Sequence, residues 1–498
     1  MTEKNSYREI LKSSSIIGGA SVINILVGLL RTKVLAVLLG PAGVGLAGLL
    51  NSMAATASSV AGMGLANVGT RQIAEAVGED NQTAIAAARR ALFWGTLILS
   101  VLGGLLFLLL REPLAQWLFG NTNNAGLVGW MAIAVVLSVA SGSQTALLNG
   151  LRRIPDLARI SVYSALLSTA MGVSAIWAFG QAGLVLFVLS TPIASFMFGH
   201  WYVAKTGKLS GQATPVSVLI TQWRVMAALG FAFMLSGLVG NAGQLLVRTI
   251  VQNELGLDAL GHFQAAWMIS MTYIGFVLTA MGTDYYPRLT AVIKDHQAVN
   301  RLVNEQTEVV LILAGPIFLA MIGLAPWVIS LLYSAQFSEA TIILQWQVLG
   351  DIIKVVSWPL GFIVLAAGAG KTYLLMESFA IGVYIVAVYL LIPSFGLEAA
   401  GISFVFMYAI YIIIVYVLAK LRTGFSWEAK IIKQFFLVFA AAVIIMLANK
   451  WSVIGSAIGS VLFSSAFAVY GLLQLNKMTT LPKPIEQLAI YIKTILKK

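Results

Sequence analysis

Apolar residues gather in long runs along the whole chain, and short polar segments separate one run from the next. We identify fourteen runs, at 14–38, 43–67, 91–110, 127–150, 160–179, 182–204, 227–250, 259–282, 308–333, 341–366, 372–393, 397–419, 434–449 and 452–474. A helix of about 20 apolar residues crosses a hydrocarbon core of roughly 30 Å and satisfies its own backbone polar groups there. The pattern predicts an all-α polytopic membrane protein with about 14 transmembrane helices.

The composition also indicates a membrane protein. Of the 498 residues, 59% are hydrophobic and only 10% are charged, which is too little polar surface to cover a soluble globule of this size. The first 13 residues are polar, and the apolar run after them is too long for a cleavable signal peptide. We therefore expect this first run to remain as a transmembrane helix.

Positive charge alternates from loop to loop. Counted from the N-terminus, the two termini and every second loop contain 25 of the 31 Lys and Arg residues, whereas the other loops contain only Arg111 and Lys450. Because basic loops stay on the cytoplasmic side, both termini are predicted to face the cytoplasm. The remaining four basic residues lie inside apolar runs.

Several classes of function do not fit the sequence. The basic residues that give the net charge of +12 are dispersed among loops and accompany no nucleic-acid-binding motif, so no nucleic-acid partner is expected. The chain has no cysteine, and its three histidines, His200, His262 and His296, are far apart. We therefore predict no metal, no cofactor and no thiol chemistry.

A short motif occurs twice in the chain. Arg31-Thr32-x-Val34 followed by Leu39-Gly40-x4-Gly45 recurs about 217 residues later as Arg248-Thr249-x-Val251 followed by Leu255-Gly256-x4-Gly261. Six runs separate the copies, so both cross the membrane in the same direction, and parallel repeats bind substrate between their two halves. We predict two pseudo-symmetric six-helix lobes at 1–210 and 211–424, with two more helices and a tail at 425–498.

Basic residues inside apolar runs are the first candidates for a site, because a charge in lipid is costly unless it faces a cavity. Arg31 and Arg248 occupy equivalent positions in the repeat. A guanidinium matches phosphate oxygens in a two-pronged geometry, so both residues could bind an anionic headgroup; the alternative is that they extend to the outer interface. Lys354 and Lys33 complete the candidate cationic cavity, although Lys33 lies on the opposite helix face from Arg31.

Acidic residues inside the runs are candidates for ion coupling. Asp351 and Lys354 are three positions apart on one helix face and are expected to neutralise each other, either permanently or until substrate or a proton arrives. Glu377 and Asp284 could bind a coupling cation or proton. The alternative for both is an ion pair near the inner membrane surface.

The C-terminal segment has a helical period of its own. Apolar residues recur at Ile485, Leu488, Ile492 and Ile495, while lysines cluster near the end of the chain. This pattern is typical of an amphipathic helix on an anionic membrane surface, with anchoring as its expected role.

The segment from Arg31-Thr32-Lys33-Val34 through Leu39-Gly40-Pro41-Ala42-Gly43-Val44-Gly45 resembles the Wzx-type O-antigen flippases. These form part of the polysaccharide transporter branch of the multidrug/oligosaccharidyl-lipid/polysaccharide exporter superfamily. The resemblance implies a V-shaped cationic cavity between two lobes, with Arg31 and Arg248 lining it. It implies translocation of undecaprenyl-pyrophosphate-linked oligosaccharide to the periplasmic leaflet, with membrane lipids, a polysaccharide polymerase and a chain-length regulator as partners.

Two alternatives stay open. A cation-coupled multidrug exporter of the same superfamily would favour acidic cavity residues, and few carboxylates lie inside the runs. A membrane glycan polymerase or ligase would need a large outer loop with catalytic polar residues, but the longest predicted outer loop covers only residues 111–126. The sequence therefore favours a transporter without enzymatic activity.

Overall fold

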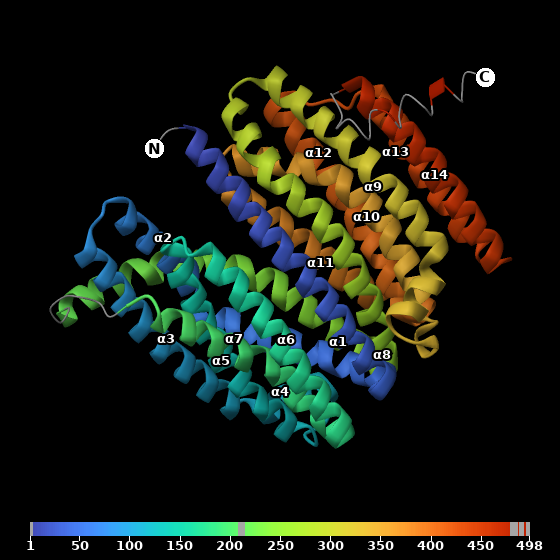
Figure 1. The fold of residues 1–498 in the computed structure, drawn as a ribbon. Helices are drawn as coiled ribbons and strands as arrows, with labels where there is room; N and C mark the ends of the chain where they lie inside the picture. The colour runs from blue at the N-terminus through green and yellow to red at the C-terminus, as the bar shows by residue number, and fades with distance from the viewer. Residues whose placement is uncertain (1–2, 208–214, 479–486, 488–492, 495–498) are drawn as a thin grey trace. The chain divides into compact units, whose positions relative to one another are not determined.

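The computed structural model describes residues 3–207 and 215–478, together with Gln487, Lys493 and Thr494, and these residues are almost entirely helical (Figure 1). Ten helical stretches are long and apolar enough to cross a membrane. Four of them are about twice the usual length and each covers two of the predicted runs: Ile16–Ala61, Ile154–Ala204, Ser217–Gly275 and Gly370–Thr423. The prediction of an all-α polytopic membrane protein is confirmed.

The chain forms two compact units, Met1–Gly261 and His262–Lys498. The first contains α1 (Glu3–Gly62), α2 (Leu65–Gly78), α3 (Gln82–Leu109), α4 (Arg111–Phe119), α5 (Ala125–Gly150), α6 (Ile154–Phe179), α7 (Leu184–Ala204) and the first part of α8 (Val216–Val292). The second contains the rest of α8, α9 (His296–Leu332), α10 (Ala340–Ala366), α11 (Gly370–Phe395), α12 (Ala399–Thr423), α13 (Ala429–Ala448) and α14 (Val453–Met478).

The first part of α8 packs within the first unit. The Trp223 indole donates to the Ala91 carbonyl over 2.9 Å, and the Asn241 amide donates to Ser59 Oγ over 2.7 Å. The boundary between the units therefore lies inside α8. The lobe boundary at residue 210 rests on the sequence repeat and stays a prediction.

Both copies of the repeated motif produce the same break in a helix. The sequence pattern predicted a loop between two runs at each copy, but α1 and α8 continue through it with one non-helical residue each. Gly40 has φ 63° and ψ −165°, and Gly256 has φ 89° and ψ 176°. Glycine adopts a positive φ without the steric penalty that a side chain would bring. Pro41 follows the first break, where its missing N–H has no helical partner to lose.

The glycines that end the two motif copies pack against each other. A Cβ atom built on Gly45 would lie 2.5 Å from the Leu257 carbonyl oxygen and 2.7 Å from the Gly261 nitrogen. A Cβ atom on Gly261 would overlap the Pro41 carbonyl. Two backbones therefore touch at equivalent positions of the repeat, as small residues allow between helices in lipid.

Two helices lie where the apolar runs predicted loops. The helix α4 occupies most of the predicted outer loop, and α2 follows the second run. Val68 and Ile73 of α2 are fully buried in an apolar cluster with Ala91 and Leu92 of α3. These helices are short and carry polar residues on one side, so their average hydropathy is too low to mark them as spans.

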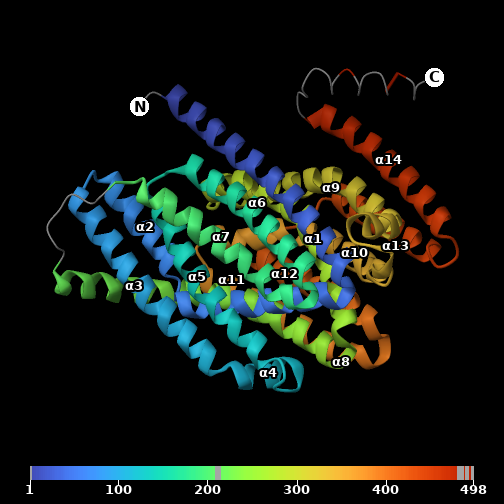
Figure 2. The ribbon, with the colours of Figure 1, turned by 60° about the horizontal axis from the view of Figure 1, so that its bottom comes forward.

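The two additional helices dock on α9. Ser464 of α14 donates to the Pro316 carbonyl over 2.8 Å, and Gly323 of α9 lies against Ser460. Beside the start of α13, the Lys430 ammonium pairs with the buried Glu308 carboxylate at 2.8 Å. Figure 2 shows α14 at the edge of the second unit, next to α13. The predicted amphipathic tail lies outside the described residues.

Candidate functional site

A cluster of charged and hydroxyl side chains lies inside the second unit, on the most buried helix, α10. Asp351 of α10 is fully buried. Its Oδ2 accepts hydrogen bonds from Ser270 Oγ and from the Tyr273 hydroxyl, each over 2.6 Å, and both donors belong to α8. Its Oδ1 is also buried, and no hydrogen bond to it is formed by the described residues. A buried carboxylate is therefore only half satisfied.

Lys354 lies one helical turn after Asp351 and is 8% exposed. Its Nζ lies 5.4 Å from the ring centre of Tyr408 and interacts electrostatically with both Asp351 and Glu377. Among the described residues, the ion pairs within 4.0 Å do not include Asp351 with Lys354. Hydroxyl donors from α8 hold Asp351, and Lys354 interacts with it electrostatically without a direct ion pair.

Glu377 of α11 provides the second carboxylate of the cluster. It accepts a hydrogen bond from the Tyr411 hydroxyl over 2.6 Å and interacts with Tyr373, one turn earlier in α11. When all three charged groups are ionised, two carboxylates face one lysine, which leaves one negative charge in excess. One proton or one monovalent cation would neutralise that excess, and an uncompensated charge in apolar surroundings is costly.

Arg31 is held by its own unit. One terminal guanidinium nitrogen donates to Ser168 Oγ over 3.0 Å and to Thr191 Oγ1 over 2.6 Å, and the other donates to the Phe187 carbonyl and to Ser190 Oγ. The guanidinium also lies 4.2 Å from the Phe187 ring centre. These contacts tie α1 to α6 and α7. Its hydrogen bonds to the described residues use only the two terminal nitrogens, so the Nε–H group is the donor that a ligand could use.

The other predicted site residues, Arg248 and Lys33 in the first unit and Asp284 in the second, each have surroundings of their own. Arg248 is 4% exposed and donates to the carbonyl and the side-chain oxygen of Gln244, one turn earlier in α8. Lys33 is half-buried. Asp284 pairs with Arg288 at 3.1 Å on an exposed stretch of α8, and a coupling role for it stays a prediction.

A cavity of about 750 Å³ lies inside the first unit, between α1, α2, α5, α6 and α7. Eleven of its seventeen lining residues carry a hydroxyl or an amide: Asn24, Asn67, Thr70, Ser138, Ser141, Thr145, Asn149, Ser161, Ser164, Thr191 and Ser195. The described residues that line it include no charged and no aromatic side chain. Its volume is typical of a small-molecule site.

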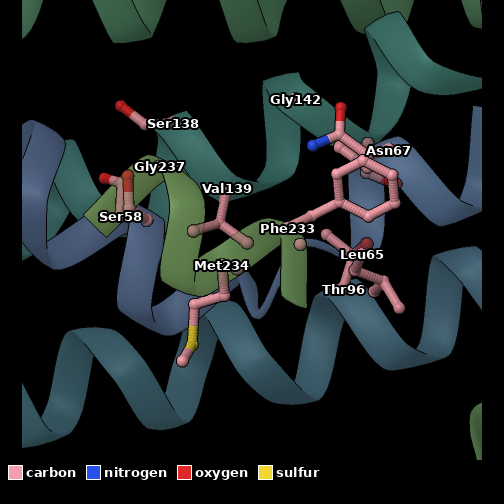
Figure 3. A pocket seen from close by; sticks show the side chains of 15 residues that line it. Ser58, Leu65, Asn67, Thr96, Ser138, Val139, Gly142, Phe233, Met234 and Gly237 are labelled. Carbon is pink, nitrogen blue, oxygen red and sulfur yellow. The ribbon is translucent and has the colours of Figure 1, made fainter. Parts of the chain in front are cut away.

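A smaller cavity of about 270 Å³ shares part of its lining with the first one, and Figure 3 shows the side chains around this smaller cavity. The two share Ala66, Asn67, Ser138 and Gly142. The smaller one is also lined by Thr96 and by Phe233 from the first part of α8. We call the two together the hydroxyl cavity.

The sequence interpretation missed the hydroxyl cavity, although one signal was present. Ser138, Ser141, Gly142, Thr145 and Asn149 recur at intervals of three and four, so they lie along one face of α5. A polar stripe on an apolar helix predicts a face that avoids lipid. The stripe carries no charge, so it does not stand out among the buried charges that marked the other candidate site residues.

Comparison with known proteins gives three relationships. The family profile of polysaccharide biosynthesis proteins matches residues 34–342. The chain is 26% identical to the lipid III flippase of Escherichia coli (strain K12) over 413 residues, which is 81% of this chain and 96% of the relative. The lipid III flippase of Shigella flexneri matches to the same extent.

Solved structures show the same fold at low sequence identity. The lipid II flippase MurJ in an inward closed conformation matches with a TM-score of 0.66 at 13% identity, over 93% of this chain and 99% of that one. A multidrug resistance MATE family transporter of the MOP superfamily, in an inward-facing conformation, also matches with a TM-score of 0.66, at 15% identity, over 80% of this chain and 94% of that one.

Proposed function

Because this chain belongs to the family of polysaccharide biosynthesis proteins, with a match that covers residues 34–342, we propose that it is a flippase for a lipid-linked oligosaccharide. The resemblance to polysaccharide transporters drawn from the segment at Arg31 is confirmed by this match. The observation that carries the proposal is the relationship to a lipid III flippase over 96% of that relative's length. It is a multi-pass membrane protein, and the proposed activity is transport without a catalysed reaction.

The substrate that we propose is undecaprenyl-pyrophosphate carrying an O-antigen unit or a related surface polysaccharide unit. It moves from the cytoplasmic to the periplasmic leaflet by alternating access of two lobes. A polysaccharide polymerase and a chain-length regulator would act on the unit after export. Support comes from the family and from the alternation of basic loops, which favours cytoplasmic termini in a bacterial inner membrane.

Arg31 and Arg248 remain our candidates for the pyrophosphate, since a permanently charged guanidinium suits a phosphate diester or pyrophosphate. In this conformation Arg31 bonds to α6 and α7 through its terminal nitrogens, so it would meet the anion through Nε or after those bonds exchange. Lys33 and Lys354 are weaker candidates. Arg248 and Lys33 both have further interactions within the chain.

The charged cluster around α10 favours coupling to a cation. Asp351 and Glu377 provide one more negative charge than Lys354 balances, so the site can accept a proton or a monovalent cation during transport. This observation also supports the second candidate function, a cation-coupled multidrug exporter. The nearly full-length relationship to lipid-linked flippases favours the first.

Complementation separates these functions. The gene should restore surface polysaccharide in a strain that lacks its own O-antigen or lipid III flippase, and it should not raise resistance in a strain that lacks drug exporters. Restored drug resistance without surface polysaccharide would establish the exporter instead. An inactive transporter variant expressed at the same level serves as the control.

A further inference from the structure

The hydroxyl cavity has the lining of a site for a neutral, hydroxyl-rich ligand. Side chains of Ser, Thr and Asn offer both donors and acceptors, as sugar hydroxyl groups do. An anion would find no cationic side chain among the described residues that line the larger cavity, and a polyprenyl chain would offer no hydrogen bonds to the hydroxyl and amide groups that eleven of these residues carry. The chemistry of the lining therefore favours the carbohydrate part of a lipid-linked substrate over its pyrophosphate and its polyprenyl chain.

Buried polar atoms at this cavity lack partners. Ser164 is 5% exposed, and its hydroxyl makes no hydrogen bond with the described residues. Asn24 donates to Ser161 Oγ over 2.5 Å, which orients its amide, while its buried Oδ1 accepts nothing within the same part of the chain. Buried polar groups in native proteins are nearly always hydrogen-bonded, so these atoms indicate a place for a bound polar molecule.

The two ends of the hydroxyl cavity differ in chemistry. At one place Thr191, which lines it, accepts a hydrogen bond from the Arg31 guanidinium. Along α5 it continues into the smaller cavity, where Ser58 Oγ is another buried atom without a partner among the described residues and Phe233 offers an aromatic ring. Aromatic rings pack against the apolar faces of sugars, so an extended chain of sugars fits along this path better than a single compact ligand.

We infer that the hydroxyl cavity binds the oligosaccharide of the lipid-linked substrate inside the first unit, and this inference rests on the proposed function. The sugar next to the pyrophosphate lies at Thr191, beside Arg31. The sugars that follow lie along the polar face of α5 toward Phe233. The Ser164 hydroxyl and the Asn24 amide oxygen form hydrogen bonds to the glycan.

Protection from a thiol reagent tests where the glycan lies. The chain has no cysteine, so Thr145→Cys on the cavity face of α5 introduces a single reactive site. Purified full-length protein in nanodiscs is treated with N-ethylmaleimide alone, with lipid III, or with undecaprenyl pyrophosphate. We expect lipid III to slow the labelling at least fivefold and undecaprenyl pyrophosphate to leave it unchanged. The control is Ser174→Cys, an exposed position on α6 that does not line the cavity.

Binding constants test the individual contacts. Ser164→Ala and Asn67→Ala should each weaken lipid III binding by roughly threefold to tenfold, the effect of losing one hydrogen bond, and leave undecaprenyl pyrophosphate binding unchanged. Ser174→Ala should change neither. Ser164→Ala removes one oxygen atom only, so the protein should fold even if Asn67→Ala does not.

The outcomes separate the two proposals. Unchanged lipid III affinity in both cavity variants, with labelling at Thr145→Cys that lipid III does not slow, would mean that water alone occupies the cavity and would overturn the inference. Equal weakening for both lipids would also overturn it, because the effect would then concern the headgroup or the fold. If the unmodified protein binds neither lipid, the proposed function itself fails.

Discussion

Asp351 and Lys354 of α10 differ in how their buried charges are compensated. Lys354 interacts with the carboxylates of both Asp351 and Glu377, whereas Asp351 also receives hydrogen bonds from Ser270 and Tyr273. Removing Lys354 leaves two buried carboxylates without a positive charge beside them. Removing the charge of Asp351 leaves one lysine and one glutamate, which still balance.

We therefore expect Lys354→Met to lower the free energy of unfolding by roughly 3–5 kcal/mol, the cost of leaving a buried charge without its partner. Asp351→Asn should cost less, and the double variant should be milder than Lys354→Met alone because it leaves one carboxylate. Thermal unfolding of the three variants in detergent at matched concentration ranks their stabilities. Equal losses of stability in Lys354→Met and Asp351→Asn would contradict the charge balance proposed for the three residues.

Arg31 has both a structural and a proposed ligand-binding role, and two substitutions distinguish them. Arg31→Ala should lower surface glycan export roughly tenfold or more, because a buried anion loses a charge-assisted partner, and Arg31→Lys should restore part of it. Ser168→Ala removes one acceptor of Arg31 but keeps the guanidinium, so export should fall by no more than about threefold. Complementation at matched expression measures both. A loss from Ser168→Ala as large as that from Arg31→Ala would leave Arg31 with a structural role only.

The sequence located the charged residues but not their surroundings. Arg31, Asp351 and Lys354 stand out because a charge in an apolar run is rare and costly. The hydrogen-bond partners of Arg31 and Asp351 come from other helices, so no spacing along the chain could show that hydroxyls of α8 would hold Asp351. The Ser164 hydroxyl, which has no hydrogen-bond partner among the described residues, could not be predicted, because a lone serine hardly changes the hydropathy of a run.

Among the helices, α1 and α8 show how much local sequence determines. The repeated Leu-Gly pair marked a boundary between runs in both, and the structure has a positive-φ glycine at each one. The sequence could not show that the boundary would be one residue instead of a loop. Nor could it show α2, because this helix is stabilised by burying one face against α3 and not by a long apolar run.

Substituting the two break residues tests their equivalence. Gly40→Ala and Gly256→Ala should each lower stability by about 1–2 kcal/mol, since a side chain makes a positive φ unfavourable. Gly28→Ala is the matched control, because Gly28 lies inside α1 with open space around it and alanine is the better helix former there. Thermal unfolding of the three variants gives the comparison. A neutral effect at Gly256 with a loss at Gly40 would show that the two breaks are not equivalent.

At the level of the whole molecule, the absence of cysteine makes the predicted topology directly testable. Single cysteines in place of Asn123 and Ser338 should react with an impermeant maleimide from the periplasm, and those in place of Gln82 and Thr206 should react only after the membrane is opened. Labelling of intact cells, with permeabilised cells as the control for reactivity, measures this. Reversed accessibility at either pair would overturn the predicted orientation of the termini.

The contact between Gly45 and Gly261 bears on how such a chain could arise. If a half-length ancestor assembled as a symmetric dimer, one glycine codon would have encoded both residues of this contact. A mutation of that codon would then have changed both residues at once. Fusion of two gene copies gives each side its own codon. Each half could then acquire different chemistry, hydroxyl groups in one and buried charges in the other, while the shared backbone contact kept both glycines.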